Sequence, residues 1–174
     1  MSIEKVILVD TNDQPIGLME KIEAHEKGLL HRAFSVFVMN KNGELMLQQR
    51  ALSKYHSPGL WTNTCCSHQR EGETSLEAAE RRLQEEMGFV TPLNEKFSFI
   101  YKAEFDNGLT EHEYDHVLVG NYEADPLINT EEAAGWKWMD LEGVKIDIEQ
   151  HPDSYTPWFK IIFEKFYHHL QVTS

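Results

Sequence analysis

The segment after Glu73 constrains the fold most, because its residues define both ends of one helix. Thr74 and Glu77 have the three-residue spacing of a capping box, in which each side chain accepts a hydrogen bond from a backbone N–H of the first turn. Apolar residues then recur at helical spacing, at Leu76, Ala79, Leu83 and Met87. Gly88 supplies the left-handed conformation that ends many helices. The sequence therefore predicts one helix of about three to four turns with a single apolar face.

The chain before this helix has the pattern of strands and turns. Residues 5–9, 33–39 and 44–50 are apolar or β-branched runs that predict strands. Residues 13–17 contain Pro and Gly and predict a turn. An Asn-Gly pair ending at Gly43 separates the last two runs, and such a pair provides the positive φ angles of a tight hairpin turn. The polar residues that follow, up to about residue 60, predict a loop.

Strands also follow the helix. Residues 97–105 alternate between apolar and more polar side chains, residues 113–122 form another extended run, and residues 136–139 predict a last short strand. Thr156 and Pro157 have the character of an N-cap and a first-turn proline of a closing helix. This order of elements predicts an α+β fold in which a mixed sheet is sandwiched between helices.

Composition limits the class of protein. We expect a single domain over residues 1–174, long enough to bury about two-thirds of its unfolded surface. Sixteen basic and 29 acidic residues give a net charge of −13, which repels nucleic acid and anionic membranes. The two cysteines are adjacent and rarely bridge in that position, and the N-terminus has no basic region followed by an apolar segment. We therefore expect a cytoplasmic protein with no membrane or nucleic-acid partner.

Two segments carry side chains suited to proton transfer. The stretch Thr-Asn-Thr-Cys-Cys-Ser-His ends at His68, and Glu111 and Glu113 follow about forty residues later. On an extended strand, Glu111 and Glu113 point to one side, whereas Cys65 and Cys66 point to opposite sides. A thiol, an imidazole and two carboxylates are the groups of a metal-assisted proton-transfer site. An enzyme is therefore the leading hypothesis.

The predicted helix has one charged edge. Arg82, Glu85 and Glu86 lie three and four residues apart, so they share an edge beside the apolar face. Carboxylates and a guanidinium on one edge can bind a metal ion together with its phosphate ligand. The alternative is an exposed charged face held by local ion pairs, and the spacing alone leaves both open.

Glu73 and residues 81–89 resemble the Nudix box, which binds a metal ion and a diphosphate. The box normally begins with Gly, where this chain has Ser67, and has Glu after its arginine, where this chain has Arg82. That glutamate helps to hold the metal that activates water, whereas an arginine would grip phosphate oxygens. The resemblance implies a Nudix-like fold, and the departures argue against Nudix hydrolysis.

Four further segments resemble type I isopentenyl-diphosphate delta-isomerases. They are Arg-Ala-Leu-Ser-Lys at 50–54, the cysteine stretch at 62–68, Glu-His-Glu at 111–113 and Tyr-Thr-Pro-Trp at 155–158. The likeness extends from about residue 6 to residue 170, with Gln69 where the family usually has Pro. It implies a metal-dependent rearrangement of isopentenyl diphosphate to dimethylallyl diphosphate, in which protons are added and removed through a carbocation-like intermediate.

The resemblance also implies two metal sites. The family holds one divalent ion with three imidazoles and two carboxylates. The matching residues are His25, His31, His68, Glu111 and Glu113. Such donors suit Mn, Zn, Fe or Co better than Mg²⁺ alone, and we expect Mn²⁺ or Zn²⁺. Mg²⁺ would instead join the substrate diphosphate to Glu86 and to the backbone carbonyl of Cys66. Asp115 shares the strand face of the two glutamates, so it is the carboxylate most easily mistaken for a ligand.

The remaining site residues also follow from the resemblance. The diphosphate-binding cations match Lys21, Arg50, Lys54 and Arg82. Glu113 and Cys66 match the acid and base pair, and a thiol suits this role because nearby charges tune its pKa. Tyr101 matches the hydrogen-bond partner of the catalytic carboxylate, and the indole ring of Trp158 would stabilise the carbocation. No organic cofactor is implied.

Two other functions stay open. A Nudix pyrophosphohydrolase would cleave a nucleoside diphosphate derivative, but it leaves the three histidines without a purpose. A non-catalytic module would bind an isoprenoid diphosphate or a metal without turnover, but it does not need both Cys66 and Glu113. We expect a monomer whose partner is its small-molecule substrate.

Overall fold

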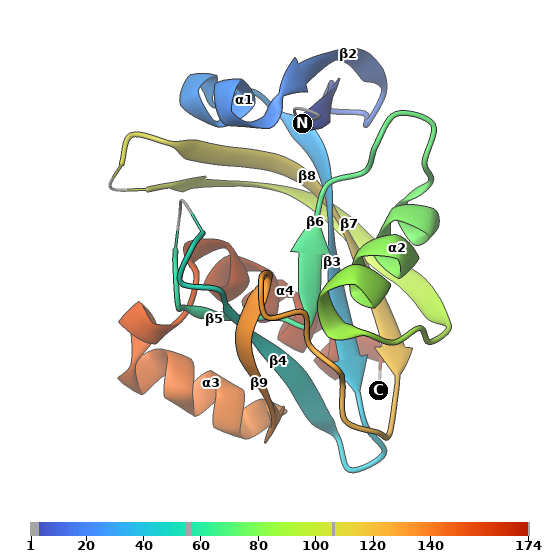
Figure 1. Ribbon diagram of the computed structural model, residues 1–174, viewed down its shortest axis with the longest axis vertical. Coiled ribbons are helices and arrows are strands. Elements are labelled where there is room, and N and C mark those ends of the chain that lie inside the picture. The colour runs from blue at the N-terminus through green and yellow to red at the C-terminus, as the bar shows by residue number, and fades with distance from the viewer. Residues whose placement is uncertain (1–3, 55–56, 106, 174) are drawn as a thin grey trace.

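The structure is a computed structural model that describes residues 4–54, 57–105 and 107–173. Within these residues, nine strands form one mixed sheet and four α-helices pack around it (Figure 1). The strands are β1 Lys5–Val9, β2 Pro15–Glu20, β3 His31–Met39, β4 Glu44–Arg50, β5 Trp61–Thr62, β6 Cys65–Ser67, β7 Leu93–Glu104, β8 Thr110–Asn121 and β9 Ala133–Asp140. The helices are α1 Lys21–Lys27, α2 Ser75–Met87, α3 Leu141–Gln150 and α4 Pro157–Thr173, with a short 3₁₀ helix at Pro152–Ser154.

Strand β3 lies at the centre of the sheet. It pairs in parallel with β8, where His31 lies beside Glu113, and antiparallel with β6, where Ser35 lies opposite Cys66. Strand β8 pairs antiparallel with β7, and β4 pairs antiparallel with β5 and β9. Strands β1 and β2 form a hairpin that joins β3 at its first residue. This register brings a histidine, a cysteine and a carboxylate from three strands to one region of the sheet.

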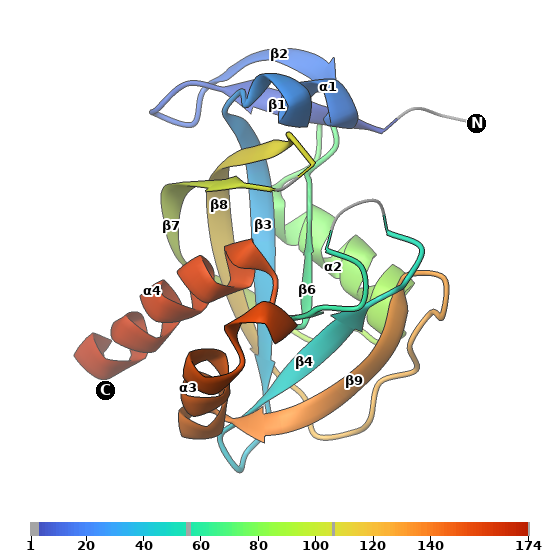
Figure 2. The same cartoon turned by 90° about the vertical axis from the view of Figure 1, so that its left-hand side faces the viewer.

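Alternate side chains of β3 face two separate cores. The Phe37 ring stacks on Phe159 and Phe166 of α4, at centroid distances of 6.2 and 4.2 Å. Val36 belongs to the other core, together with Leu83 of α2. Figure 2 shows α2 and α4 on opposite sides of the strands. A mixed sheet sandwiched between helices confirms the predicted α+β fold.

The two predicted helices have the predicted ends. In α2, the Glu77 N–H donates to Thr74 Oγ1 at 3.1 Å, and the Thr74 N–H donates to Glu77 Oε1 at 2.9 Å. Gly88 ends the helix in the left-handed conformation, with φ of 73°. In α4, the Phe159 N–H donates to Thr156 Oγ1 at 3.2 Å. Local side-chain chemistry therefore sets these boundaries.

The predicted hairpin between β3 and β4 is right about the turn and wrong about the pairing. The Asn40 N–H donates to the Glu44 carbonyl at 3.0 Å, and Gly43 has the positive φ of the turn, 78°. The two strands share only one paired position, Met39 with Leu45. They then separate, because β3 pairs along its length with β8, and β4 pairs with β9. The hairpin pattern does not specify these distant partners.

Two helices are not indicated by the sequence pattern. Helix α1 has seven residues and no side-chain cap at Glu20, so it offers too few turns for a periodic signal. Helix α3 does have a cap, because Asp140 accepts a hydrogen bond from the Gly143 N–H at 2.5 Å.

Strand β8 begins earlier than predicted, at Thr110, which places Glu111 inside it. Among the described residues, no helix combines the length and apolar character needed to cross a bilayer.

Candidate active site

A cavity of about 860 Å³ opens between the N-terminal segment, the helix α2 and the start of α4. The predicted site residues that line it are Lys21, Arg50, Lys54, Cys66, His68, Arg82, Glu86, Tyr101, Glu111, Glu113 and Trp158. The other two predicted residues, His25 and His31, contact its carboxylates: His25 Nε2 lies 3.6 Å from Glu111, and His31 Nε2 lies 3.1 Å from Glu113. The fold therefore brings every predicted site residue to one place.

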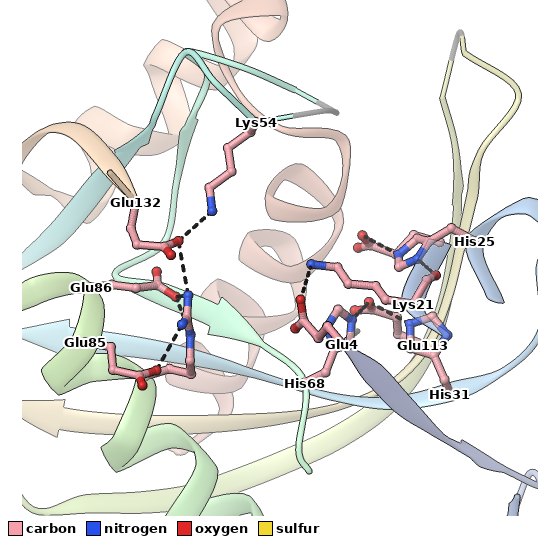
Figure 3. A network of polar contacts seen from close by, with 12 residues as sticks. Glu4, Lys21, His25, His31, Lys54, His68, Glu85, Glu86, Glu113 and Glu132 are labelled. Carbon is pink, nitrogen blue, oxygen red and sulfur yellow. Dashed lines mark hydrogen bonds and ion pairs between the residues drawn. The ribbon is translucent and has the colours of Figure 1, made fainter. Parts of the chain in front are cut away.

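Four of these residues form a compact group of metal-ligating atoms. One side-chain atom from each of His25, His31, His68 and Glu113 lies within 4.8 Å of the others. The three imidazole rings have centroid separations of 5.1, 5.9 and 5.0 Å. They come from α1, β3 and the residue after β6, and Figure 3 shows them around Glu113. All four side chains are buried.

The hydrogen bonds of the histidines fit a bound cation. His25 Nδ1 lies 2.6 Å from the Lys21 carbonyl, and His31 Nδ1 lies 2.9 Å from the Leu29 carbonyl. A carbonyl only accepts, so Nδ1 carries the proton and a neutral ring keeps its lone pair on Nε2. A neutral His31 ring would point this lone pair at an oxygen of Glu113, and only a protonated ring could donate to that oxygen. The same oxygen lies 2.9 Å from His68 Nε2. A divalent ion held by these nitrogen and oxygen donors would remove that repulsion.

Glu111 lies beside this group rather than within it. The Tyr101 hydroxyl is 2.5 Å from Oε1 of both Glu111 and Glu113, and it has one proton to donate. The alternation of β8 thus places both glutamates on one face, as predicted. Asp115 is on that face too, but it is fully buried and accepts from the Ser35 hydroxyl at 2.9 Å. It is therefore not one of the four clustered residues.

The pKa values of Glu111 and Glu113 shift in opposite directions. Burial, and then the negative charge of Glu113, raises the pKa of Glu111. Burial opposes ionisation of Glu113 as well, but hydrogen bonds from His31 and His68 outweigh it and hold the pKa of Glu113 well below its usual value. Burial also lowers the pKa of His68 to about 4, so this ring is neutral at pH 7. The site therefore combines a carboxylate whose ionised form is favoured, Glu113, with a His68 ring that is neutral at pH 7.

The two cysteines face opposite sides of β6, as predicted. Cys65 is fully buried in the core that contains α2, whereas Cys66 lines the cavity. Burial raises the pKa of Cys66 to about 12, although the positive charge of Arg50 opposes the shift. The Arg50 guanidinium also lies 4.9 Å from the ring centroid of Trp158. The Cys66 thiol is thus protonated at pH 7.

Ion pairs form the opposite wall of the cavity. Arg82 donates to Glu86 and to Glu85, each at 2.9 Å. Lys54 lies 2.5 Å from Glu132, and Arg82 also reaches Glu132 at 3.2 Å. Figure 3 shows Lys54, Glu132, Glu85 and Glu86 as one group, apart from the histidines. Both interpretations of the helix edge therefore hold in part. Its charges are locally paired, and Arg82 and Glu86 also line the cavity, whereas Glu85 does not.

Sequence reasoning missed several residues that line the cavity, and three of them contact predicted site residues. Gln48 Nε2 donates to Glu86 Oε1 at 3.0 Å and to the Thr64 carbonyl at 2.9 Å, so it orients this carboxylate. Glu4 pairs with Lys21 at 3.5 Å. Glu132 precedes β9, where no motif marks it. A polar residue inside the predicted strand 44–50 was the available signal for Gln48, and the other two had none.

Comparisons with known proteins agree with this geometry. A family model described as the NUDIX domain matches residues 29–159. An isopentenyl-diphosphate Delta-isomerase 2 from Photorhabdus laumondii is 52% identical over 159 residues, which are 91% of this chain and 90% of that protein. Another isopentenyl-diphosphate Delta-isomerase 2, from Aromatoleum aromaticum, is 48% identical over 162 residues, which are 93% of this chain and 86% of that protein.

Solved structures show the same fold at low sequence identity. A crystal structure from Deinococcus radiodurans superimposes with a TM-score of 0.78 at 19% identity, and covers 93% of this chain and 98% of that one. A MutT protein from Methanosarcina mazei gives a TM-score of 0.64 at 20% identity, over 80% of this chain and 94% of that one. The Nudix fold is thus confirmed, and at about half identity over most of its length the chain belongs to the isopentenyl-diphosphate Delta-isomerase family of the NUDIX superfamily.

Proposed function

We propose that this protein is an isopentenyl-diphosphate Delta-isomerase, which converts isopentenyl diphosphate to dimethylallyl diphosphate for isoprenoid biosynthesis. One observation carries the proposal: the Cys66 thiol and the Tyr101–Glu113 pair line the same cavity as the four cationic side chains matched to the diphosphate. The reaction adds a proton at one carbon and removes another two carbons away, so it needs two groups that exchange protons. The relatives named above support this assignment.

The proton-transfer groups are Glu113, with Tyr101, and Cys66. The pKa of Glu113 is held well below its usual value, which favours its ionised form, and the short Tyr101 hydrogen bond can carry a proton to or from it. A divalent ion bound by His25, His31, His68, Glu113 and Glu111, for which we propose Mn²⁺ or Zn²⁺, would fix Glu113 in place and stabilise its negative charge. The thiol of Cys66 is the second proton carrier.

The cavity also has groups that protect a cationic intermediate. Trp158 is 2% exposed, and its ring already holds the guanidinium of Arg50 at 4.9 Å. An indole that binds one cation by its face is suited to stabilise a carbocation. Tyr101, Glu113 and Trp158 are each at most 5% exposed, so little water would reach an intermediate held between them.

The diphosphate would bind in the cavity between the wall of ion pairs and Lys21. We propose that Lys21, Arg50, Lys54 and Arg82 hold its oxygens, and that Glu86 and the Cys66 carbonyl hold Mg²⁺ bound to it. These cations give a local attraction that the net charge of −13 does not. We further propose one domain over residues 1–174, acting as a cytoplasmic monomer without nucleic-acid or membrane partners.

The decisive experiment follows the substrate in heavy water. Purified protein is incubated with isopentenyl diphosphate, Mg²⁺ and Mn²⁺, and carbon-bound protons and phosphorus are observed together by NMR. Dimethylallyl diphosphate with incorporated deuterium and both phosphates intact is expected. Release of phosphate would instead indicate a Nudix pyrophosphohydrolase, which the arginine at position 82 disfavours. Binding without turnover would indicate a non-catalytic module.

A further inference from the structure

One carboxylate, that of Glu132, pairs with two of the cations that we assign to the diphosphate. Lys54 Nζ lies 2.5 Å from Glu132 Oε2, and Arg82 Nη2 lies 3.2 Å from the same oxygen. One oxygen that bridges an ammonium and a guanidinium is placed as a phosphate oxygen would be. Glu132 therefore takes the position of an anionic ligand toward two side chains from distant parts of the chain.

The backbone holds Glu132 at this point. Its carbonyl accepts from the Ala51 N–H at 3.3 Å, which anchors it to the segment that carries Lys54. The same loop is anchored to helix α2, because the Asn129 N–H donates to the Glu86 carbonyl at 2.9 Å. The Glu132 side chain is 26% exposed, so it reaches the cavity and is still partly shielded from water. Its charge is thus held between the two cations rather than free to move into solvent.

Isomerisation creates a particular problem for release of the product. Substrate and product carry the same diphosphate, so every contact with it holds the product as tightly as the substrate. Such uniform binding lowers KM without raising kcat. A carboxylate that competes for the same cations would weaken the binding of the diphosphate in both molecules and would speed the release of the product.

We infer that Glu132 competes with the bound diphosphate for Lys54 and Arg82, and takes these two cations back when the product leaves. The inference rests on the proposed function, because it assigns the diphosphate to these side chains. Glu132 acts through other residues, so it is a positioning residue and not a catalytic one. Its negative charge repels a diphosphate at this wall, and its contacts also hold the two cations in place. We expect the repulsion to have the larger effect on the affinity for diphosphate.

The first test measures binding without turnover. Isothermal titration calorimetry with inorganic pyrophosphate and Mg²⁺ compares the wild type with Glu132→Gln, which keeps the shape of the side chain and removes its charge. We expect binding about tenfold tighter, which corresponds to about 1.4 kcal/mol. Glu131→Gln is the matched control. Glu131 is exposed and adjacent in sequence, and its replacement changes the net charge by the same amount. Its affinity should stay that of the wild type.

The second test separates competition from preorganisation. With isopentenyl diphosphate, Glu132→Gln should lower KM without raising kcat, whereas loss of preorganised cations would raise KM. Weaker or unchanged pyrophosphate binding in a folded Glu132→Gln protein would overturn the inference. Glu132→Ala carries the same test if the glutamine variant does not fold, since its short side chain leaves room for water. Tighter pyrophosphate binding in a chain without isomerase activity would refute the proposed function and leave the competition intact.

Discussion

The side chains of Cys65 and Cys66 leave β6 in opposite directions, so a one-residue difference separates a core position from a cavity position. We predict that Cys66→Ala lowers kcat at least about 100-fold, because it removes one of the two proton carriers. The fold should be unchanged by circular dichroism. Cys65→Ala should keep its activity and lose about 1 kcal/mol of stability, because it leaves a small cavity. If Cys65→Ala were the inactive variant, the assignment of the thiol would be wrong.

His68 should make the metal-free protein sensitive to acid. Burial lowers its pKa to about 4, so the unfolded chain binds a proton at His68 below about pH 6.5, whereas the folded protein does not. The contribution to the free energy of unfolding is therefore complete above pH 6.5 and is lost as the pH falls toward 4. It amounts to about 3 kcal/mol.

The comparison of wild type with His68→Asn isolates this effect. Urea unfolding of both proteins with a chelator present should give a difference in stability that changes between pH 6.5 and 4 and is constant above that range. His25, whose pKa is raised, acts in the opposite direction but is present in both proteins. Parallel stability curves would show that His68 is protonated as readily in the folded protein as in the unfolded chain.

At the scale of elements, the end of α2 controls how the loop before β9 is held. A Cβ on Gly88, which has φ of 73°, would overlap the Leu127 carbonyl. The Leu127 N–H in turn donates to the Met87 carbonyl at 2.9 Å. We predict that Gly88→Ala lowers the free energy of unfolding by about 2–4 kcal/mol, because it adds overlap to a strained backbone.

Gly72 provides the control for that prediction. It also has a positive φ, 86°, but a Cβ there meets no atom within 4 Å. Gly72→Ala should therefore cost only the backbone strain, about 1 kcal/mol. Chemical denaturation of both variants gives the comparison. Equal losses would mean that backbone conformation alone, and not the contact with Leu127, limits position 88.

Elements differ in how far their sequence predicts them. Helix α2 has a capping box and a terminal glycine, so local residues specify its ends. Helix α1 has no side-chain cap and only seven residues, so it forms through its contacts with β1, β2 and β8. Strands β3 and β4 look like a hairpin in sequence, but their main partners are β8 and β9. Distant pairing decides these cases, and local patterns do not report it.

At the scale of the molecule, the histidine cluster joins the N-terminal segment to the sheet. His25 is on α1, His31 begins β3 and Glu113 is on β8. We predict that removal of the metal lowers the melting temperature and increases amide exchange in α1 more than in α3. Restored Mn²⁺ or Zn²⁺ at about 100 times its Kd should return about 2.7 kcal/mol of stability. Equal exchange changes in α1 and α3 would show that the metal does not link these parts.

Sequence alone determined on which face of a strand each candidate side chain lies, because this depends only on local periodicity. The two-residue period of a strand places Glu111 with Glu113 and separates Cys65 from Cys66, and the motifs then identify the family. These features need no knowledge of which segments meet. The sequence was therefore enough to nominate every residue of the metal group.

Only the tertiary structure decided which charges share the cavity. Glu132 lies 78 residues from Lys54 and 50 residues from Arg82, and no motif links them. They meet because β4 pairs with β9 and because the loop before β9 is bonded to the end of α2. Ion pairs form between any charges that the fold brings within reach, so their partners follow from the topology of the sheet rather than from local sequence.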